Sequence, residues 1–136
     1  MKRWGILLGL LLLLAGCMRP PQKVTLTLPG NPSTGYVWTI QQDKELFAVK
    51  ETQKEPDTEA VGAPADTVFE LTPEKAGEVE VVFTYAREWE PEQYQRLIYH
   101  FRIDDNQQIE CTKTDAQAAG ENMKTPEIVK PNIEAQ

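Results

Sequence analysis

The stretch Asn31-Pro32-Ser33-Thr34-Gly35-Tyr36 decides the expected fold. Asparagine, serine and threonine side chains bond to nearby backbone, proline fixes φ at about −65°, and glycine accepts positive φ. Apolar residues alternate with polar ones on both sides, over 24–28 and over 36–40. The pattern predicts a stiff polar loop between two half-buried strands. Because such turn signals are common, a simple hairpin or inter-sheet turn with no binding role is the alternative interpretation.

The same alternation recurs along the chain and predicts an all-β domain. Ten prolines and eight glycines, many at apparent strand ends, fit a fold with many turns. The polar segment 51–60 is expected to form a long exposed loop. The best fold is an immunoglobulin-like β-sandwich of about six or seven strands over 23–111. The strands are expected over 24–28, 36–40, 46–49, 67–71, 79–85 and 97–103.

The N-terminal segment 1–16 has the pattern of a secretory leader. Two basic residues precede an apolar run that is too short to span a bilayer, and Leu14-Ala15-Gly16-Cys17 closes it. The segment resembles bacterial lipoprotein signals, which implies lipid attachment at Cys17, a short tether over 17–22 and a place in the cell envelope. Met18 in place of an aspartate favours the outer membrane, facing the periplasm. A plain signal peptide or a short anchor is the alternative.

Charge and composition set further limits. The chain has 14 basic and 21 acidic residues, and loss of Lys2 and Arg3 with the leader would leave a net charge of −9. Nucleic acid is therefore not an expected partner. The segment 112–136 is polar and has no aromatic residue, so we predict a disordered tail there.

The sequence offers no catalytic constellation. His100 is the only histidine and alternates with apolar residues, so we interpret it as a partly exposed strand residue. No histidine–cysteine cluster has zinc spacing, and no glycine pattern suits phosphate. Cys111 has no evident partner or neighbouring cation and is interpreted as a strand-end or surface thiol. We expect neither an enzyme nor a cofactor nor a bound metal.

Two later stretches give the first one a context. Gly62-Ala63-Pro64-Ala65 forms a second loop of small residues, and Tyr85-Ala86-Arg87-Glu88-Trp89-Glu90 ends an apolar strand. Asn-Pro-Ser-Thr-Gly-Tyr, then Gly-Ala, then Arg-x-Trp, in this order, resembles the chagasin family. The resemblance covers about 24–104. It implies a non-covalent, reversible inhibitor of papain-like, clan CA, cysteine peptidases, which acts as a monomer.

The resemblance also implies a mechanism with three loops. The 31–35 loop would enter the peptidase cleft, with the loops at 61–65 and 87–95 on its flanks. Proline and alanine at 64–65 replace glycines of the family, and Glu88 replaces a proline. The expected peptidase-binding residues are Asn31, Pro32, Ser33, Thr34, Gly35, Tyr36, Gly62, Ala63, Pro64, Arg87 and Trp89.

Two tryptophans receive different interpretations. Trp89 stands outside the alternation, so it is either an exposed interface anchor or a side chain folded over the sandwich edge. Trp38 alternates with apolar neighbours and is expected in the core. Two other functions stay open at this point. One is an envelope lipoprotein that uses the sandwich as an adaptor without inhibiting a peptidase, and the other is a small-ligand binder.

Overall fold

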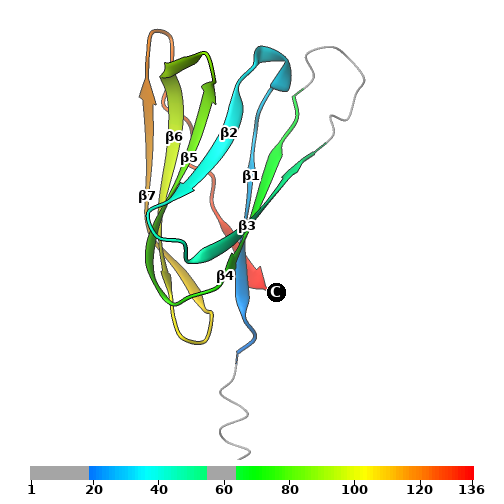
Figure 1. The fold of residues 1–136 in the computed structure, drawn as a ribbon, viewed down its shortest axis with the longest axis vertical. Coiled ribbons are helices and arrows are strands. Elements are labelled where there is room, and N and C mark those ends of the chain that lie inside the picture. Colours follow the sequence, from blue (N-terminus) through cyan, green and yellow to red (C-terminus); the bar gives the residue numbers. More distant parts are fainter. Residues whose placement is uncertain (1–18, 55–63) are drawn as a thin grey trace, which may run out of the picture.

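The fold is a sandwich of two four-stranded antiparallel sheets in a computed structural model that describes residues 19–54 and 64–136 (Figure 1). One sheet has the order β3-β4-β1-β8, and the other has the order β2-β5-β6-β7. The expected all-β sandwich is confirmed, with eight strands in place of six or seven. They are β1 (Gln22–Leu28), β2 (Val37–Gln42), β3 (Phe47–Gln53), β4 (Thr67–Pro73), β5 (Gly77–Arg87), β6 (Glu90–Ile103), β7 (Ile109–Ala119) and β8 (Asn132–Ala135).

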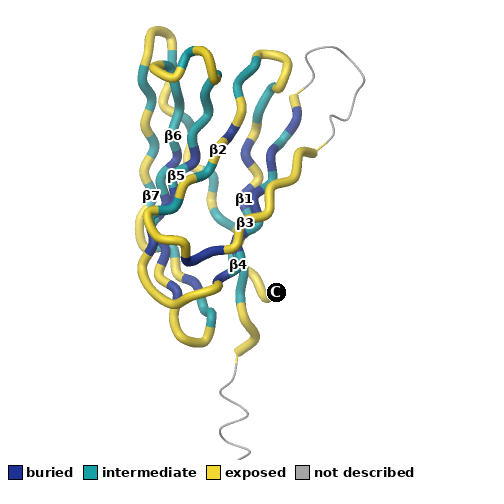
Figure 2. Tube along the Cα trace, in the orientation of Figure 1, coloured by how far each residue is buried: buried dark blue, intermediate teal, exposed yellow. Residues whose placement is uncertain are grey.

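The core lies between the two sheets, where one face each of β1, β4, β5 and β6 is buried (Figure 2). Successive strand residues point to opposite faces, so the alternation seen in the sequence becomes an apolar inner face and a polar outer face. Trp38 belongs to this core, as predicted. Its largest fully buried side chains are Tyr99, Phe69, Phe83, Phe101, Leu26, Leu28, Leu71, Leu97, Val24 and Val81.

Strand pairing brings three connections to one end of the sandwich, which we call the loop end. Leu28 at the end of β1 pairs with Thr67 at the start of β4, and Val37 at the start of β2 pairs with Ala86 near the end of β5. The crossing from β1 to β2, the approach to β4 and the turn from β5 to β6 therefore meet there (Figure 1). The crossing carries one turn of 3-10 helix, η1 (Pro32–Thr34).

The predicted disordered tail over 112–136 is wrong. Residues 109–119 form β7 against β6, and 132–135 form β8 against β1. Between them the chain crosses from one sheet to the other, and the Tyr99 hydroxyl donates a 2.6 Å hydrogen bond to the Val129 carbonyl. The prediction failed because it considered only apolar side chains, whereas a strand edge also satisfies backbone groups of a polar segment. Val129 and Ile133 still pack against the core.

The expected loop over 51–60 is wrong at its start, because residues 51–53 belong to a strand. Its first three residues continue β3, and Thr52 and Gln53 pair with Val68 and Thr67 of β4. The side chains of this edge strand beyond Phe47 are exposed, so the strand shows no apolar alternation beyond its start. The remainder of the predicted loop falls largely outside the described residues.

Candidate functional site

The crossing at the loop end is a turn capped at both ends. The Asn31 side-chain oxygen accepts from the Ser33 backbone N–H at 3.2 Å and from the Ser33 hydroxyl at 2.6 Å. The Thr34 hydroxyl donates to the Asn31 carbonyl at 2.7 Å. Gly35 ends η1 with φ 82°, in the left-handed region that favours glycine. These local bonds give an exposed loop little conformational freedom, which agrees with the predicted stiff turn.

Trp89 lies across Gly35, although the two are far apart in the sequence. A β-carbon built on Gly35 would collide with Cη2 of the indole and would lie 3.0 Å from Cζ2. Glycine therefore serves twice, because it permits the positive φ and leaves room for the ring. Trp89 is still 67% exposed. Both interpretations of this residue hold in part, since the ring folds back onto η1 and also presents most of its surface to solvent.

Arg87 also contacts both segments, the turn at 31–36 and the turn that carries Trp89. Its Nε donates to the Thr34 carbonyl at 2.8 Å, and its guanidinium lies 4.4 Å from the centroid of the Tyr36 ring. It also pairs with Glu90 at 3.5 Å and stands 5.9 Å from the Trp89 ring centroid. A guanidinium can bond in its plane and stack on an aromatic face at once, which a lysine cannot do.

Three aromatic rings, those of Tyr36, Tyr85 and Trp38, pack in a row between this surface and the core. The Tyr85 ring stacks on Tyr36 at 5.2 Å and lies 4.9 Å from Trp38, while the Tyr85 hydroxyl accepts from the Asn31 N–H at 3.0 Å. The Trp38 indole donates to the Pro29 carbonyl at 2.9 Å. Tyr85 was absent from the predicted site. Its position at the loop-end terminus of an inward-facing apolar series was the signal that could have identified it.

The second predicted loop is only partly described. Gly62 and Ala63 lie outside the described residues, as does Cys17. Pro64 is exposed, and the Ala65 N–H donates to the Gly30 carbonyl at 3.0 Å. The end of this loop therefore adjoins the segment that leads into η1.

The third predicted loop, over 87–95, is wrong in extent. Arg87 pairs with Glu90, so a turn of two residues, 88–89, joins β5 to β6, and the rest of the segment belongs to β6. A hairpin with a two-residue turn holds its tip more firmly than an open loop of nine residues would. The predicted residues Arg87 and Trp89 remain together at that tip.

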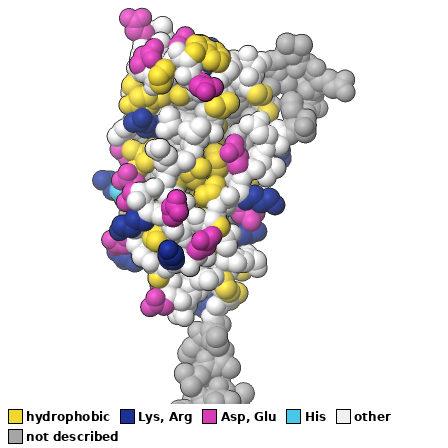
Figure 3. Space-filling view, in the orientation of Figure 1, with side chains coloured by type: hydrophobic (Ala, Val, Ile, Leu, Met, Phe, Trp, Pro, Cys, Tyr) yellow, Lys and Arg dark blue, Asp and Glu magenta, His cyan; other side chains and the backbone are white. Residues whose placement is uncertain are grey.

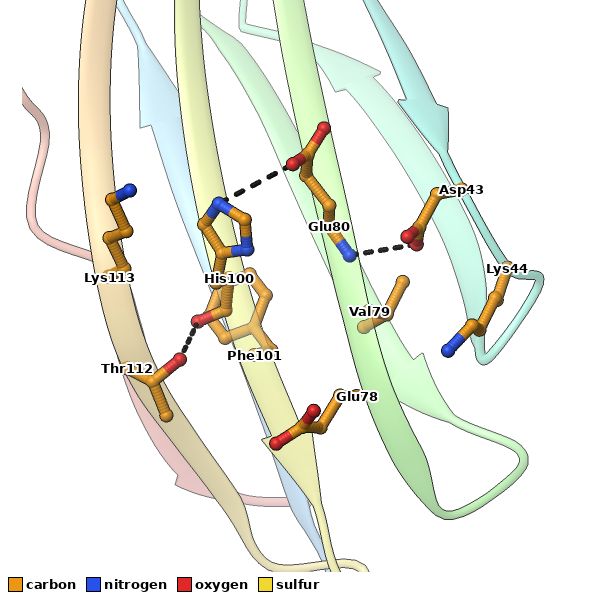
Figure 4. Close-up of a pocket in the computed structure, with 9 residues that line it drawn as sticks. All are labelled: Asp43, Lys44, Glu78, Val79, Glu80, His100, Phe101, Thr112 and Lys113. Carbon is orange, nitrogen blue, oxygen red and sulfur yellow. Dashed lines mark hydrogen bonds and ion pairs between the residues drawn. The ribbon is translucent and has the colours of Figure 1, made fainter.

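A depression lined by several charged side chains lies on the outer face of the β2-β5-β6-β7 sheet and shows no catalytic arrangement (Figure 4). His100 is partly exposed, as predicted, and its Nε2 lies 3.4 Å from Glu80. The Thr112 hydroxyl donates to the His100 carbonyl at 3.2 Å, so it does not orient the imidazole as a base. Within the described residues, no group of three or more His, Cys, Asp or Glu side chains is arranged to hold a metal ion.

Cys111 is half-buried in β7, and burial raises the pKa of its thiol. A raised pKa leaves less thiolate at neutral pH, so the group is a poor nucleophile.

No helix in 19–54 or 64–136 is long and apolar enough to cross a bilayer.

Comparison with known proteins shows which family this sequence matches. The model described as "Chagasin family peptidase inhibitor I42" matches residues 18–103. Chagasin from Trypanosoma cruzi is 32% identical over 74 residues, which cover 50% of this chain and 67% of chagasin. Amoebiasin-2 from Entamoeba histolytica is 33% identical over 70 residues, which cover 49% of this chain and 57% of that protein. A crystal structure of a cysteine protease inhibitor from Entamoeba histolytica is similar at 35% identity and a TM-score of 0.44, over 50% of this chain and 65% of that one.

Binding residues are concentrated on loops that a rigid scaffold holds in place, and the loop end has this arrangement. This chain belongs to the chagasin family of peptidase inhibitors. The membership confirms the expectation that the chain is not an enzyme. The matched residues include η1 and the 88–89 turn and end at residue 103, before β7 begins.

Proposed function

We propose that this protein is a non-covalent, reversible inhibitor of papain-like, clan CA, cysteine peptidases. One observation carries the proposal: two motifs more than fifty residues apart form one exposed surface, with Trp89 seated on Gly35 and Arg87 bonded to Thr34. A surface that is already ordered loses little entropy on binding, so its contacts contribute more fully to affinity. The relative from Entamoeba histolytica with a solved structure is a cysteine protease inhibitor.

The proposed mechanism requires a turn that fills the cleft without being cleaved. Three carbonyls of the turn already accept hydrogen bonds: that of Asn31 from Thr34, that of Pro32 from Gly35 and that of Thr34 from Arg87. A peptidase cleaves an extended segment whose scissile carbonyl enters the oxyanion hole. The backbone of η1 is curled and these three oxygens are occupied, so the turn presents a poor substrate.

The flanks of the turn have separate proposed roles. Trp89 is the exposed anchor on one side, because a large aromatic side chain buries much area at little cost in rotamer entropy. Residues 62–64 are proposed to contact the other side of the cleft. Glu88, at the tip beside Trp89, adds a negative charge that tunes which peptidases are accepted.

The test is a titration of the protein from Met18 onward against papain and a cathepsin L-type peptidase. Inhibition at or below micromolar concentration is expected. Thr34→Arg is expected to abolish most of it, because a bulky cation would sit at the centre of the contact. Asp105→Lys, in the turn between β6 and β7 at the far end of the molecule, serves as the matched control and should inhibit as wild type does. A folded wild-type protein that inhibits neither enzyme would leave an adaptor role as the better account.

A second proposal concerns location. Leu14-Ala15-Gly16-Cys17 supports lipid attachment at Cys17 and anchoring in a bacterial envelope, in the outer membrane facing the periplasm. Cys17→Ser should release the protein from the membrane fraction. If the variant still sediments with membranes as wild type does, attachment at this residue is wrong.

A further inference from the structure

β7 brings the chain back to the loop end. The residues that follow β7 lie there, against the proposed inhibitory surface. Figure 1 shows the turn after β7 at the same end of the molecule as η1 and the 88–89 turn. Pairing of β6 with β7 continues to Tyr94 and Ala119, so the residues that follow β7 lie near the start of β6. We call residues 120–123 the C-terminal turn. It lies outside the residues that match the family.

Contacts with β6 and a hydrogen bond within the turn hold the C-terminal turn in place. Gly120 has φ 107°, and a β-carbon there would lie 2.6 Å from Cγ of Gln93, so the backbone is packed closely against β6. The Met123 N–H donates to the Gly120 carbonyl at 3.4 Å, and the Gln95 side chain donates to the Lys124 carbonyl at 2.8 Å. Its tip is therefore held by contacts rather than projecting freely.

One side of the turn joins the proposed surface directly. The Tyr36 hydroxyl lies 3.9 Å from the Met123 sulfur, and the same tyrosine ring carries the Arg87 guanidinium. A continuous path of contacts thus runs from the C-terminal turn through Tyr36 and Arg87 to Trp89 and Thr34. Residues 121–122 of the same turn are exposed, so they are open to a partner that binds at the loop end.

The exposed side chain at the tip is acidic. Glu121 has no ion pair within the described residues, and the same holds for Glu88 and Glu92, whereas Glu90 pairs with Arg87. Gly120 packs against Gln93, and Glu121 and Glu92 are the chain neighbours of these two residues, so both acidic residues belong to the edge of this surface. In the upper part of Figure 3, acidic side chains lie among hydrophobic ones.

We infer that the C-terminal turn is a fourth contact with the target peptidase, and that Glu121 selects enzymes with basic side chains on the adjoining rim of the cleft. The inference rests on the proposed inhibitory function. Charges at the rim of an interface act mainly on the association rate and are screened by salt. The turn would thus set which peptidase is captured quickly, while η1 and Trp89 hold it.

The experiment measures association rates of the full-length protein, purified in detergent, with papain and with a cathepsin L-type peptidase. For the enzyme whose association slows most with added salt, Glu121→Lys should reduce the rate about tenfold at low ionic strength. Glu121→Gln should reduce it about threefold. Both differences should largely vanish at high salt, and Asp105→Lys, an equal change at the opposite end, should have little effect.

Each other outcome has a distinct meaning. If wild type inhibits both enzymes but Glu121→Lys associates at the wild-type rate, the fourth contact is overturned while the inhibitory function stands. An equal loss in Asp105→Lys, or no salt dependence with either enzyme, overturns it too. If wild type inhibits neither enzyme, the proposed function itself fails. Melting temperatures of the variants show whether the fold is intact.

Discussion

The surroundings of Trp38 and of Trp89 differ although both rings lie at the loop end. Trp38 is 5% exposed, donates to the Pro29 carbonyl and packs on Tyr85 within the core cluster. Trp89 is 67% exposed and rests on a glycine whose backbone it covers. The first ring has its polar group satisfied and its faces buried. The second has one face seated and the rest of its surface open.

Under the proposed function, this difference separates the residues that stabilise the domain from those that bind the peptidase. A buried ring contributes through area removed from water and through close packing, so its loss opens a cavity. An exposed ring contributes little to folding, yet offers a partner a large and already oriented apolar surface. The two layers meet at Tyr85 and Tyr36, so changes can be assigned to one layer or the other.

Trp38→Ala should give the largest effect. It removes a core ring and leaves the Pro29 carbonyl without its donor, so the free energy of unfolding should fall by about 3–5 kcal/mol. Denaturant titration measures the loss. Trp89→Ala is the matched control and should stay within about 1 kcal/mol of wild type. Equal losses in the two variants would remove the distinction between the layers.

Gly35→Ala should come next and should act on inhibition more than on folding. The new methyl group requires a strained left-handed alanine, at a cost of about 1–2 kcal/mol, and displaces the Trp89 ring. We expect the inhibition constant to rise about thirtyfold or more. In a Trp89→Ala background the same change should cost less, because the clash is gone, and this double-mutant cycle isolates the contact. Strict additivity would mean that the indole does not rest on Gly35 in solution.

Trp89→Ala alone should raise the inhibition constant about tenfold, which corresponds to about 1.4 kcal/mol. This loss is modest for an interface tryptophan because part of the ring already contacts Gly35 in the free protein. Trp89→Phe should recover part of the affinity. An unchanged inhibition constant together with a lowered melting temperature would mean that Trp89 belongs to the structural layer.

Cys111→Ala should have the smallest effect. The thiol is half-buried and its pKa is raised by burial, so it reacts slowly with a thiol reagent at neutral pH. We expect a change in melting temperature of no more than a few degrees and no change in inhibition. Rapid labelling, or a covalent dimer lost in the variant, would show that this cysteine has a function.

The sequence alone predicted the core well. The inner faces of β1, β4, β5 and β6 alternate strictly, and period-2 alternation has one physical interpretation when one face is buried. Trp38 and the stiffness of the 31–35 turn followed from the same local rules. Each of these features is decided by residues that are neighbours along the chain.

The failures concern features that depend on distant residues. Tyr85 supports Asn31 only because β5 ends beside η1, and no local pattern indicates that hydrogen bond. The contact of Trp89 with Gly35 depends on the register shift near Arg87 and on a hairpin turn of two residues. β8 has only four residues, three of them exposed, and it is ordered because it pairs with the edge of β1.

The place of β1 in its sheet has a mechanical consequence. β1 begins at the end of the proposed tether, continues directly toward η1, and is bonded to β4 on one side and to β8 on the other. Just before β1, the Pro21 carbonyl accepts a hydrogen bond from the Gln136 N–H at 2.8 Å, so Gln136 helps to hold the beginning of this strand in place. Under the proposed anchoring and inhibition, a pull between Cys17 and a partner held on η1 runs along this one strand. The covalent backbone of β1 therefore carries this load, and the hydrogen bonds that join β1 to β4 and β8 are largely spared.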